Sequence, residues 1–478
     1  MDRSTTTRPA AHRAAAEERV LRKQAAEVLW GNWTGTSTVP SRALYPHQWS
    51  WDSAFIAIGL RHLSPLRAQV ELETLLAAQW GDGRVPHIVF NDAVPPGAYF
   101  PGPDFWRSTT AGRPSGAPGG VRTSGLVQPP VHALAAWLVH RADPGLSRAR
   151  SFLARAHPRL TAWHHYLLSS RDAGGAGLAA VVHPWEQGMD NSPCWDGPLS
   201  RVEPAGPEAF RRADLAYGAP EDRPTDLDYG RYVRLAAEYR DRRYADGRAH
   251  GAFSVEDPAF NALLIASEYA LARIEHELTN TAEVLTRDPD ERRTRARKLT
   301  ETLVARLWDP RRELFLCRDL RAPGPDGELI TERGVAGLVP LVLPALPPGI
   351  AAALVRTACG PHFGLGGPAR LVPSYDLTGR AFDPRRYWRG PAWFNTNWLL
   401  EKGLRLHGEQ ARADGLRDAL LDAAVTSGFA EYVDPYTARG SGARGFGWTA
   451  ALALDLLLDD GRDERGGPGG LSEGEVQA

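Results

Sequence analysis

The segment 183–196, "HPWEQGMDNSPCWD", places three carboxylic acids, Glu186, Asp190 and Asp196, beside two tryptophans. A carboxylate favours water, which the face of an indole ring does not supply. The combination suits a site in which a sugar ring stacks on the aromatic face while an acid acts on the glycosidic bond. The segment therefore indicates glycoside chemistry.

Hydrolysis of a glycosidic bond needs two carboxylic groups on opposite sides of that bond. One must hold a proton at working pH, and burial near apolar groups raises the pKa of a carboxyl group far enough to allow this. Asp190 fits the acid because a methionine and two tryptophans flank it in the sequence. Glu431 fits the base because it follows an apolar Gly-Phe-Ala and precedes a tyrosine. The two lie far apart in the chain, so only a closed fold would bring them together.

Each of these acids also has a plainer interpretation. The run "MDNSP" is turn-like, so Asp190 could cap a helix, and Asp52 could cap the helix that follows it. Glu431 could be a solvated acid in a loop. Glu186 and Asp196 could pair with some of the many arginines.

Other catalytic chemistries find no support in the motifs. His47, His87 and His183 stand apart, without HxH or HExxH spacing, so no metal site is predicted. A GxSxG nucleophile motif, a Walker motif and a dinucleotide-binding glycine motif are all missing from the sequence. The three cysteines form neither a CxxC pattern nor a disulfide framework. The sequence therefore predicts an activity that needs no cofactor.

The composition of the chain limits the kinds of partner that it is expected to bind. The chain has 478 residues, of which 43% are hydrophobic and 24% charged, with a formal net charge of -1. This is a globular composition without a basic stripe, so neither nucleic acid nor an anionic membrane is an expected partner. A run of about 18 apolar residues, as a membrane span requires, is missing, and so is an apolar signal-peptide core. We expect a cytoplasmic protein that acts on a small soluble carbohydrate; its oligomeric state stays open.

Helical periodicity dominates the chain, so the elements that position these residues are expected to be mostly helices. It predicts helices over 12–29, 51–62, 66–80, 129–141, 147–170, 228–244, 257–276, 290–307, 333–344, 347–358, 391–407, 410–428 and 446–459. Short strands are expected near 88–90, 180–183 and 314–317. The long connections 81–127, 171–227, 309–331 and 359–388 are rich in glycine and proline and hold most of the unusual tryptophans and acids.

A succession of about a dozen helices with rich loops favours an all-α fold, a closed ring of helix pairs known as an (α/α)6 barrel. The prediction is a single domain over 1–460. Its loops near 81–127 and 171–227 would form a cap over the active-site funnel. The polar tail 461–478 is expected to be disordered.

Several blocks, in order along the chain, resemble glycoside hydrolase family 63, within it the bacterial mannosylglycerate and glucosylglycerate hydrolase branch. The resemblance runs from about residue 45 to 448. Its blocks are "HPWEQGMDNSP" (183–193), "TSGLVQPPV" (123–131), "RPTDLDYGRY" (223–232), "DPAFNALL" (257–264) and "FDPRRYWRGPAWFNTNW" (382–398). Any one block could arise by chance, whereas several in the family's own order make a specific signal.

The resemblance implies an (α/α)6 barrel that inverts the anomeric carbon, with Asp190 as acid and Glu431 as base. The sugar-site positions that it implies are Tyr45, Trp49, Trp51, Asp52, Gln128, Trp185, Gly188, Tyr387 and Trp388. Arg223 and Tyr229 match the arginine and tyrosine that serve an acidic aglycone in this branch. The Gly-rich "GGGGEY" run of related trehalases is absent from this chain, which has "ARGSGARG" (438–445) instead, and this argues against trehalase. Whether the segment 438–446 alters the choice of aglycone stays open.

The predicted substrate is a small α-glucoside or α-mannoside, such as glucosylglycerate or mannosylglycerate, and the sequence leaves the choice of sugar open. Two other classes of function are kept as alternatives. A sugar epimerase or a lyase on the same fold would need a His or Tyr acid–base pair in the funnel. A non-catalytic carbohydrate-binding protein would not demand both carboxylates. For Arg223 the plain alternative is a surface ion pair with the neighbouring Glu221, Asp222 or Asp226.

Overall fold

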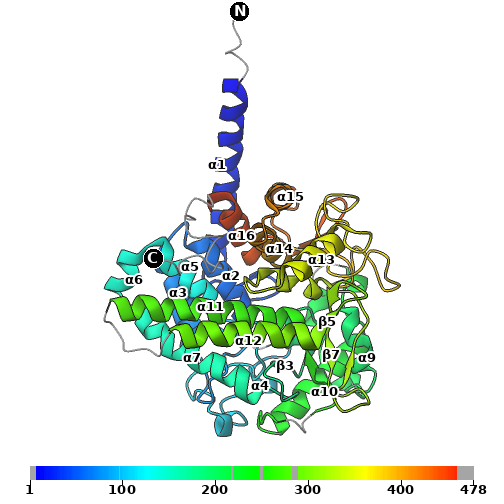
Figure 1. Ribbon diagram of the computed structural model, residues 1–478. Coiled ribbons are helices and arrows are strands. Elements are labelled where there is room, and N and C mark those ends of the chain that lie inside the picture. Colours follow the sequence, from blue (N-terminus) through cyan, green and yellow to red (C-terminus); the bar gives the residue numbers. More distant parts are fainter. Residues whose placement is uncertain (1–6, 96, 217–218, 248–250, 282–288, 460–478) are drawn as a thin grey trace, which may run out of the picture.

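The computed structural model describes residues 7–95, 97–216, 219–247, 251–281 and 289–459. These residues are mostly helical, as predicted (Figure 1). The expected disordered tail 461–478 lies outside them. The longer helices are α1 (Thr7–Gly31), α2 (Ser50–Leu60), α3 (Pro65–Ala77), α5 (His132–Ala142), α7 (Phe152–Ser170), α10 (Asp226–Asp241), α11 (Pro258–Asn280), α12 (Pro289–Leu307), α13 (Pro348–Cys359), α14 (Phe394–Leu406), α15 (Gln410–Thr426) and α16 (Gly447–Leu458).

The core is built from helices that are apolar on nearly every side. Every residue of α2 is buried, and so are the first ten of α16. A helix that is hydrophobic all round has no face for solvent and must lie inside. The two pack together closely at Gly59, where an added Cβ would lie 2.2 Å from the carbonyl oxygen of Ala451. Only glycine permits this approach.

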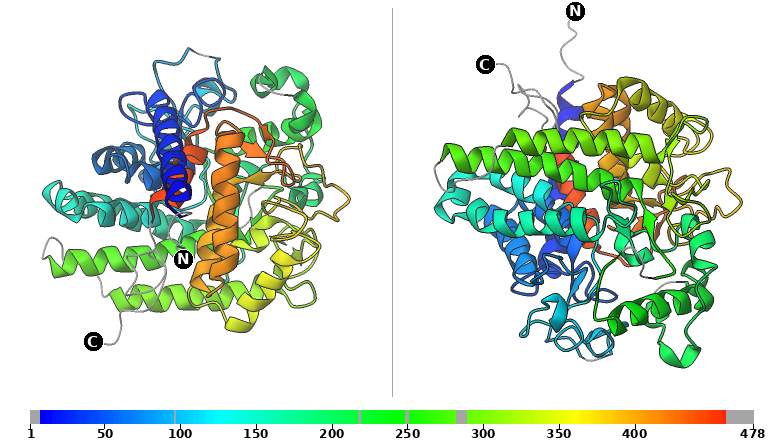
Figure 2. Two further views of the ribbon diagram at one scale, coloured as in Figure 1. Left: turned by 90° about the horizontal axis from the view of Figure 1, so that it is seen from above. Right: turned by 60° about the horizontal axis from the view of Figure 1, so that its bottom comes forward.

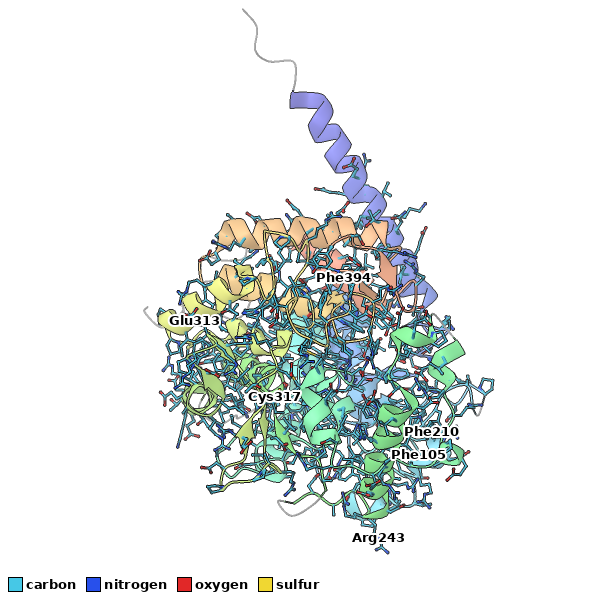
Figure 3. The ribbon with its side chains drawn as sticks, turned by 90° about the vertical axis from the view of Figure 1, so that its right-hand side faces the viewer. Phe105, Phe210, Arg243, Glu313, Cys317 and Phe394 are labelled. Carbon is cyan, nitrogen blue, oxygen red and sulfur yellow. The ribbon has the colours of Figure 1, made fainter. Side chains whose placement is uncertain are left out.

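Outer helices cover this interior. The buried α11 packs along α12, whose sequence "PDERRTRARKLTETLVARL" is rich in charged residues (Figure 1). The buried α14 packs against the more polar α15 in the same way. Helix α1 rises away from the body (Figure 1), and Figure 2 shows α11 and α12 running side by side in two further views. Cys317 and Phe394 lie within the body, whereas Arg243 lies at its margin (Figure 3).

Each strand is only two residues long, and the strands join loop segments to one another. Strand β1 (Gln48–Trp49) pairs with β2 (Ile88–Val89), and β9 (Ala392–Trp393), β10 (Tyr432–Val433) and β11 (Gly440–Ser441) form a second sheet in the order β11-β10-β9. The other two sheets are β3-β4-β7-β8 and β5-β6, with strands β3 (Ala180–Val181), β4 (Val255–Glu256), β5 (Trp308–Asp309), β6 (Leu314–Phe315), β7 (Arg318–Asp319) and β8 (Glu328–Leu329). The strands expected near 88–90, 180–183 and 314–317 are thus confirmed.

Two predicted helices were wrong. The expected helix 147–170 is divided into α6 (Pro144–Ala149) and α7, because Ser151 adopts the left-handed region with φ 50°. The expected helix 333–344 is replaced by two 3-10 turns, η6 (Val335–Gly337) and η7 (Val339–Val342). Pro340 lacks the N–H that a continuous helix would need there. Gly337 passes so close to a carbonyl oxygen of Phe315 that an added Cβ would lie 2.2 Å from it.

The long connections 81–127 and 171–227 hold short helices rather than plain loop. They include α4 (Pro103–Trp106), α8 (Pro184–Gln187), α9 (Asp196–Leu199) and the 3-10 turns η1 (Arg113–Ser115), η2 (Pro193–Trp195), η3 (Pro207–Ala209), η4 (Ala213–Ala216) and η5 (Pro220–Asp222). Among the described residues, none of the helices is both long and apolar enough to cross a bilayer.

Candidate active site

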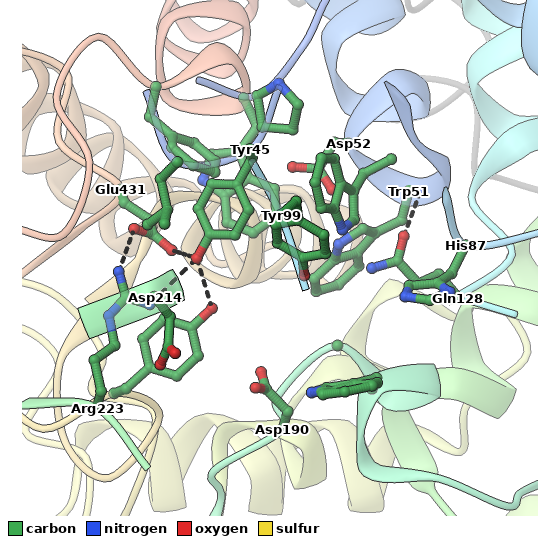
Figure 4. A pocket seen from close by; sticks show the side chains of 18 of the residues that line it. Tyr45, Trp51, Asp52, His87, Tyr99, Gln128, Asp190, Asp214, Arg223 and Glu431 are labelled. Atoms are coloured by element: carbon green, nitrogen blue, oxygen red, sulfur yellow. Dashed lines mark hydrogen bonds and ion pairs between the residues drawn. The ribbon is translucent and has the colours of Figure 1, made fainter. Parts of the chain in front are cut away.

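One cavity lies where the buried helices begin. The chain enters α2 through Trp49 and α16 through Phe446, and both residues line the cavity. It collects eleven of the twelve other residues singled out above: Tyr45, Trp51, Asp52, Gln128, Trp185, Gly188, Asp190, Arg223, Tyr229, Tyr387 and Glu431 (Figure 4). The fold therefore brings together segments that span almost 400 residues of chain.

Asp190 is held in a tightly fixed loop. The hydroxyl of Tyr232 donates to the Asp190 carbonyl oxygen at 2.7 Å, and the indole N–H of Trp195 donates to the Met189 carbonyl oxygen at 2.8 Å. The loop follows Gly188, whose φ of 83° suits glycine. Asp190 does not cap a helix, since Ser192 caps the following turn. The side chain is thus free to face the cavity (Figure 4).

Burial raises the pKa of the Asp190 carboxyl group to about 7. The backbone N–H of Asp190 and the charge of Arg223 lower this pKa, while the charges of Glu431 and Asp214 raise it. A carboxyl group with a pKa near 7 can hold a proton at neutral pH and also release it. This is the property that a general acid requires.

Glu431 is a buried acid, 1% exposed, and not the solvated loop acid of the plainer interpretation. It accepts hydrogen bonds from the Tyr45 hydroxyl at 2.9 Å and from the backbone N–H of Ala443 at 3.0 Å. Arg223 Nη2 lies 3.5 Å from Glu431 Oε2. These three groups fix the direction of the carboxylate, which faces the cavity from the side opposite Asp190 (Figure 4).

The segment 438–446 shapes the base side of the cavity. It forms β11 and returns along β10, which directly follows Glu431. An added Cβ at Gly442 would lie 2.4 Å from Glu431 Oε2, so the glycine lets the hairpin reach the carboxylate. Phe446, at the end of the segment, packs edge-on against Tyr45 at 5.9 Å between ring centroids.

Arg223 does not lie at the surface. Its side chain is 5% exposed, and its Nη1 donates to the Tyr45 hydroxyl at 3.2 Å. The guanidinium carbon lies 4.7 Å from the centroid of the Tyr387 ring. The expected surface pairs with Glu221, Asp222 and Asp226 are therefore not its contacts. The structure instead places a buried cation beside the candidate base.

The opposite end of the cavity is aromatic and acidic. Trp51 packs edge-on against Trp448 at 5.3 Å, and its backbone N–H donates to Gln128 Oε1 at 3.2 Å. Asp52 lies in the first turn of α2 and does not cap it, because the helix already begins at Ser50. Burial raises the pKa of Asp52 well above its usual range. An aromatic wall with a carboxyl group and an amide suits the ring and hydroxyls of one sugar.

Trp388 is the exception among the predicted sugar-site residues, since it is not among those that line this cavity. Its indole ring stacks on Trp393, with centroids 3.8 Å apart and planes parallel within 1°. Trp388 lies behind Tyr387, which does line the cavity, with 6.3 Å between their ring centroids. Trp388 can support the wall without touching a ligand.

The other two acids of the opening segment form ion pairs, which confirms their plainer interpretation. Arg171 Nη1 lies 2.6 Å from Glu186 Oε2. Glu186 also accepts from the backbone N–H of Val127, one residue before Gln128, at 3.3 Å. Arg389 Nη1 donates to Asp196 Oδ2 at 3.0 Å. These pairs hold the loops that carry the site.

Sequence reasoning missed part of the cavity wall. The further lining residues include His87, Tyr99, Phe100, Asp214, Phe446 and Trp448. His87 is buried, which holds the pKa of its imidazole well below the usual range, and its ring stacks on Trp185. Trp448 could have been found as a tryptophan in the glycine-rich run "GFGWT", whereas nothing in "RRADLA" around Asp214 marks a site. Within the described ranges, no group of His, Cys, Asp and Glu is arranged to hold a metal ion.

The arrangement can perform acid–base chemistry on a sugar. A half-buried acid with a pKa near 7 and a second, fixed carboxylate face one cavity, and aromatic rings and polar groups suited to a pyranose line its walls. The buried Arg223 adds a positive charge, so a ligand that carries a carboxylate would find a partner there.

The sequence matches a known family over residues 45–449, described as "Mannosylglycerate hydrolase MGH1-like glycoside hydrolase domain". It is 41% identical to a mannosylglycerate hydrolase of Rubrobacter radiotolerans over 441 residues, 91% of this chain and 96% of that one. It is also 39% identical to a glucosylglycerate hydrolase of Mycolicibacterium hassiacum over 449 residues, 91% of this chain and 97% of that one.

The fold is similar to a solved structure from the same group. A crystal structure of the glycoside hydrolase family 63 mannosylglycerate hydrolase of Thermus thermophilus, in complex with Tris and D-glycerate, aligns with a TM-score of 0.80 at 40% sequence identity. The alignment covers 91% of this chain and 99% of the Thermus chain.

Proposed function

The chain belongs to the mannosylglycerate hydrolase MGH1-like family of glycoside hydrolases, and on that premise we propose that it hydrolyses the α-glycoside of D-glycerate with inversion. It is an O-glycosyl hydrolase that acts on small glycosides, as the family's named members are. One observation carries the finer proposal: Asp190, with its pKa near 7, and Glu431 face one cavity whose wall also holds the buried Arg223.

Asp190 acts as the general acid. As the bond between the anomeric carbon and the aglycone oxygen breaks, the electron pair stays on that oxygen, and Asp190 gives it a proton. Burial keeps this carboxyl group protonated until the aglycone leaves. Asp190 is then a carboxylate and regains a proton from solvent.

Glu431 acts as the general base. It removes a proton from a water molecule, whose oxygen attacks the anomeric carbon on the face opposite the leaving aglycone. Tyr45 and the backbone N–H of Ala443 hold the carboxylate toward the cavity. Attack from that face converts an α-glycoside into a β-configured free sugar. An inverting pair leaves room for water, so we expect the two carboxyl groups to lie ~6.5–9.5 Å apart.

The sugar would occupy the end of the cavity formed by Trp49, Trp51, Asp52 and Gln128. The indole rings would cover its C–H face, while the carboxyl and amide groups would bind its hydroxyls. Trp185 would close the side next to Asp190 and exclude water from the acid. Mannose and glucose differ at one hydroxyl group, and relatives at similar identity carry either name.

The aglycone would bind through Arg223 and Tyr229. Arg223 is buried and stacks on Tyr387, so its guanidinium is already positioned. A glycerate carboxylate would give it a bidentate, charge-assisted partner. Tyr229 is anchored through its hydroxyl, which donates to the Phe100 carbonyl oxygen at 3.0 Å, and its ring would cover the aglycone.

We also propose the architecture of the fold, a closed ring of helix pairs. The alternation of buried helices such as α11 and α14 with polar outer helices such as α12 and α15 supports an (α/α)6 barrel. We propose one domain over 1–460, with the segments near 81–127 and 171–227 as its cap.

Purified protein should be incubated with α-mannosylglycerate, α-glucosylglycerate, trehalose, kojibiose and nigerose, with free sugar and glycerate measured. Release of glycerate, with the β-anomer formed first by proton NMR, is expected. The Glu431→Gln variant is the matched control for contaminating activity. Hydrolysis of the neutral disaccharides without the glycerate glycosides would refute the acidic aglycone. A changed sugar without release of an aglycone would instead point to an epimerase, and binding without turnover to a carbohydrate-binding protein.

A further inference from the structure

Asp214 is a cavity-lining carboxylate that the hydrolytic mechanism does not use. It belongs to the 3-10 turn η4, and its side chain is 19% exposed. Figure 4 shows it pointing into the cavity from the part of the wall that also holds Arg223. A carboxylate placed in a closed site without a catalytic task needs another explanation, because its loss of water is costly.

Arg212 fixes this carboxylate in one orientation. Its Nε donates to Asp214 Oδ1 at 2.9 Å, and its Nη2 donates to Oδ2 at 2.8 Å. Arg212 also donates to Asp226 Oδ1 at 2.7 Å and to the Pro224 carbonyl oxygen at 2.8 Å, and it covers the Tyr229 ring at 4.6 Å. The positive charge of Arg212 offsets that of Asp214, and the bidentate geometry holds the Asp214 oxygens still.

Asp214 lies close to the proposed aglycone residues, because Arg212, which holds its carboxylate, covers the ring of Tyr229. Burial raises the pKa of Asp190 and of Tyr229, and the negative charge of Asp214 contributes to both rises. The general acid protonates the oxygen of the leaving group. Asp214 lines the cavity together with Tyr229 and Arg223, so in the proposed mode of binding it faces the aglycone.

Each oxygen of Asp214 keeps acceptor capacity after its bond to Arg212, because a carboxylate oxygen has two acceptor sites. A carboxylate has acceptor sites and no donor, so Asp214 offers no partner to the carboxylate of an acidic aglycone, which has one in Arg223. Asp214 attracts a hydroxyl hydrogen instead. The two groups together orient a hydroxy acid, with its carboxylate at Arg223 and its hydroxyl at Asp214.

We propose that Asp214 accepts a hydrogen bond from the terminal hydroxyl of the aglycone and thereby selects glycerate over acids without that hydroxyl. This inference rests on the proposed function. A site built to bind a substrate hydroxyl rejects the analogue that lacks it, because its own polar group is then buried without a partner. Arg212 is a positioning residue that acts through Asp214.

The test compares the α-mannosides of D-glycerate and D-lactate, which differ only in the terminal hydroxyl. The wild-type protein should favour the glycerate compound in kcat/KM by about 10- to 100-fold, the range for a hydrogen bond to a charged group. Asp214→Ala should lower kcat/KM on the glycerate compound until the two substrates react at nearly the same rate. Asp214→Asn keeps an acceptor oxygen and should retain part of the preference.

The ratio of the two substrates is measured within one preparation, so it does not depend on how much of a variant is folded. Asp226→Ala removes another Arg212 contact at a side chain that is 78% exposed, and it should leave the ratio unchanged. Arg212→Ala should reduce the ratio, and Arg212→Lys should restore part of it because one charged donor remains.

Two outcomes would overturn this inference alone. An equal fall on both substrates in Asp214→Ala would mean that Asp214 only holds its loop, and an unchanged ratio would mean that it does not contact the aglycone. A wild-type protein inactive on both compounds and on the matching α-glucosides would refute the proposed function, and this inference with it.

Discussion

Replacing Asp190 with asparagine should stabilise the folded protein in alkaline solution while it removes the general acid. Burial raises the pKa of this carboxyl group from 3.8 to about 7. Between those two pH values the folded protein therefore holds one proton more at this residue than the unfolded chain does. The contribution of Asp190 to stability is present at low pH and is lost as the pH rises through about 7. Asparagine cannot ionise and escapes this loss.

The size of this change in the free energy of unfolding follows from the pH interval over which the unfolded chain, but not the folded protein, has lost the proton of Asp190. From pH 5 to the folded pKa near 7 there are about two decades, each worth about 1.36 kcal/mol, which gives roughly 2.7 kcal/mol. Asp190 is only half-buried and lines the cavity, so its carboxyl group is not fully enclosed in the protein, and about 1–3 kcal/mol is expected. With about 2.1 cal/mol/K of unfolding entropy per residue over 478 residues, each kcal/mol changes the Tm by about 1 °C.

The assay is thermal unfolding of wild type and Asp190→Asn at pH 5 and at pH 8. The Tm of the variant relative to wild type should rise by about 1–3 °C between the two conditions. Asp92→Asn serves as the control, because its side chain is 76% exposed and loses little water on folding. A variant whose Tm differs from wild type by the same amount at both pH values would refute the raised pKa of Asp190.

Four further predictions concern activity and packing. Asp190→Asn and Glu431→Gln should each lower kcat by ~10²–10⁴ in a folded protein, and near-normal turnover would remove that residue from the mechanism. In wild type, kcat/KM should fall as the pH rises through about 7, because Asp190 then loses its proton; a flat profile up to pH 9 would exclude it as the acid. Arg223→Ala should lower kcat/KM on a glycerate glycoside by roughly 10–150-fold and much less on a neutral aryl α-glycoside, since only the former carries a carboxylate; equal losses would mean that Arg223 acts through Glu431 instead. Gly188→Ala should displace Trp51 and weaken sugar binding, because its Cβ would lie 2.6 Å from the indole ring at a positive φ; an unchanged KM would show that the loop can yield.

The local pattern of the chain was sufficient for the buried helices and for the types of residue in the site. The near-continuous apolar runs of α2 and α16 required burial. The aromatic residues around Asp190 marked its block as a sugar site. Local pattern failed at 147–170 and 333–344, where a left-handed Ser151 and close backbone approach at Gly337 broke the expected helices. The approach of Gly337 to Phe315 joins residues distant in the chain and leaves no periodic signal, and the periodicity gave no sign of the left-handed backbone at Ser151.

The sequence by itself determined two things about this protein. Its residue types and motifs include a pair of acids suited to glycoside chemistry, and its periodicity requires a mostly helical chain to carry them. Only the tertiary structure decided which side chains share a cavity. It stacked Trp388 on Trp393 and left it out of the cavity lining, placed Arg223 beside Glu431, and brought Asp214 to the cavity wall. The physical reason is that the direction and the burial of a side chain depend on packing between segments distant in the chain, such as the pairing of β9, β10 and β11. Sequence patterns report only neighbours along the chain.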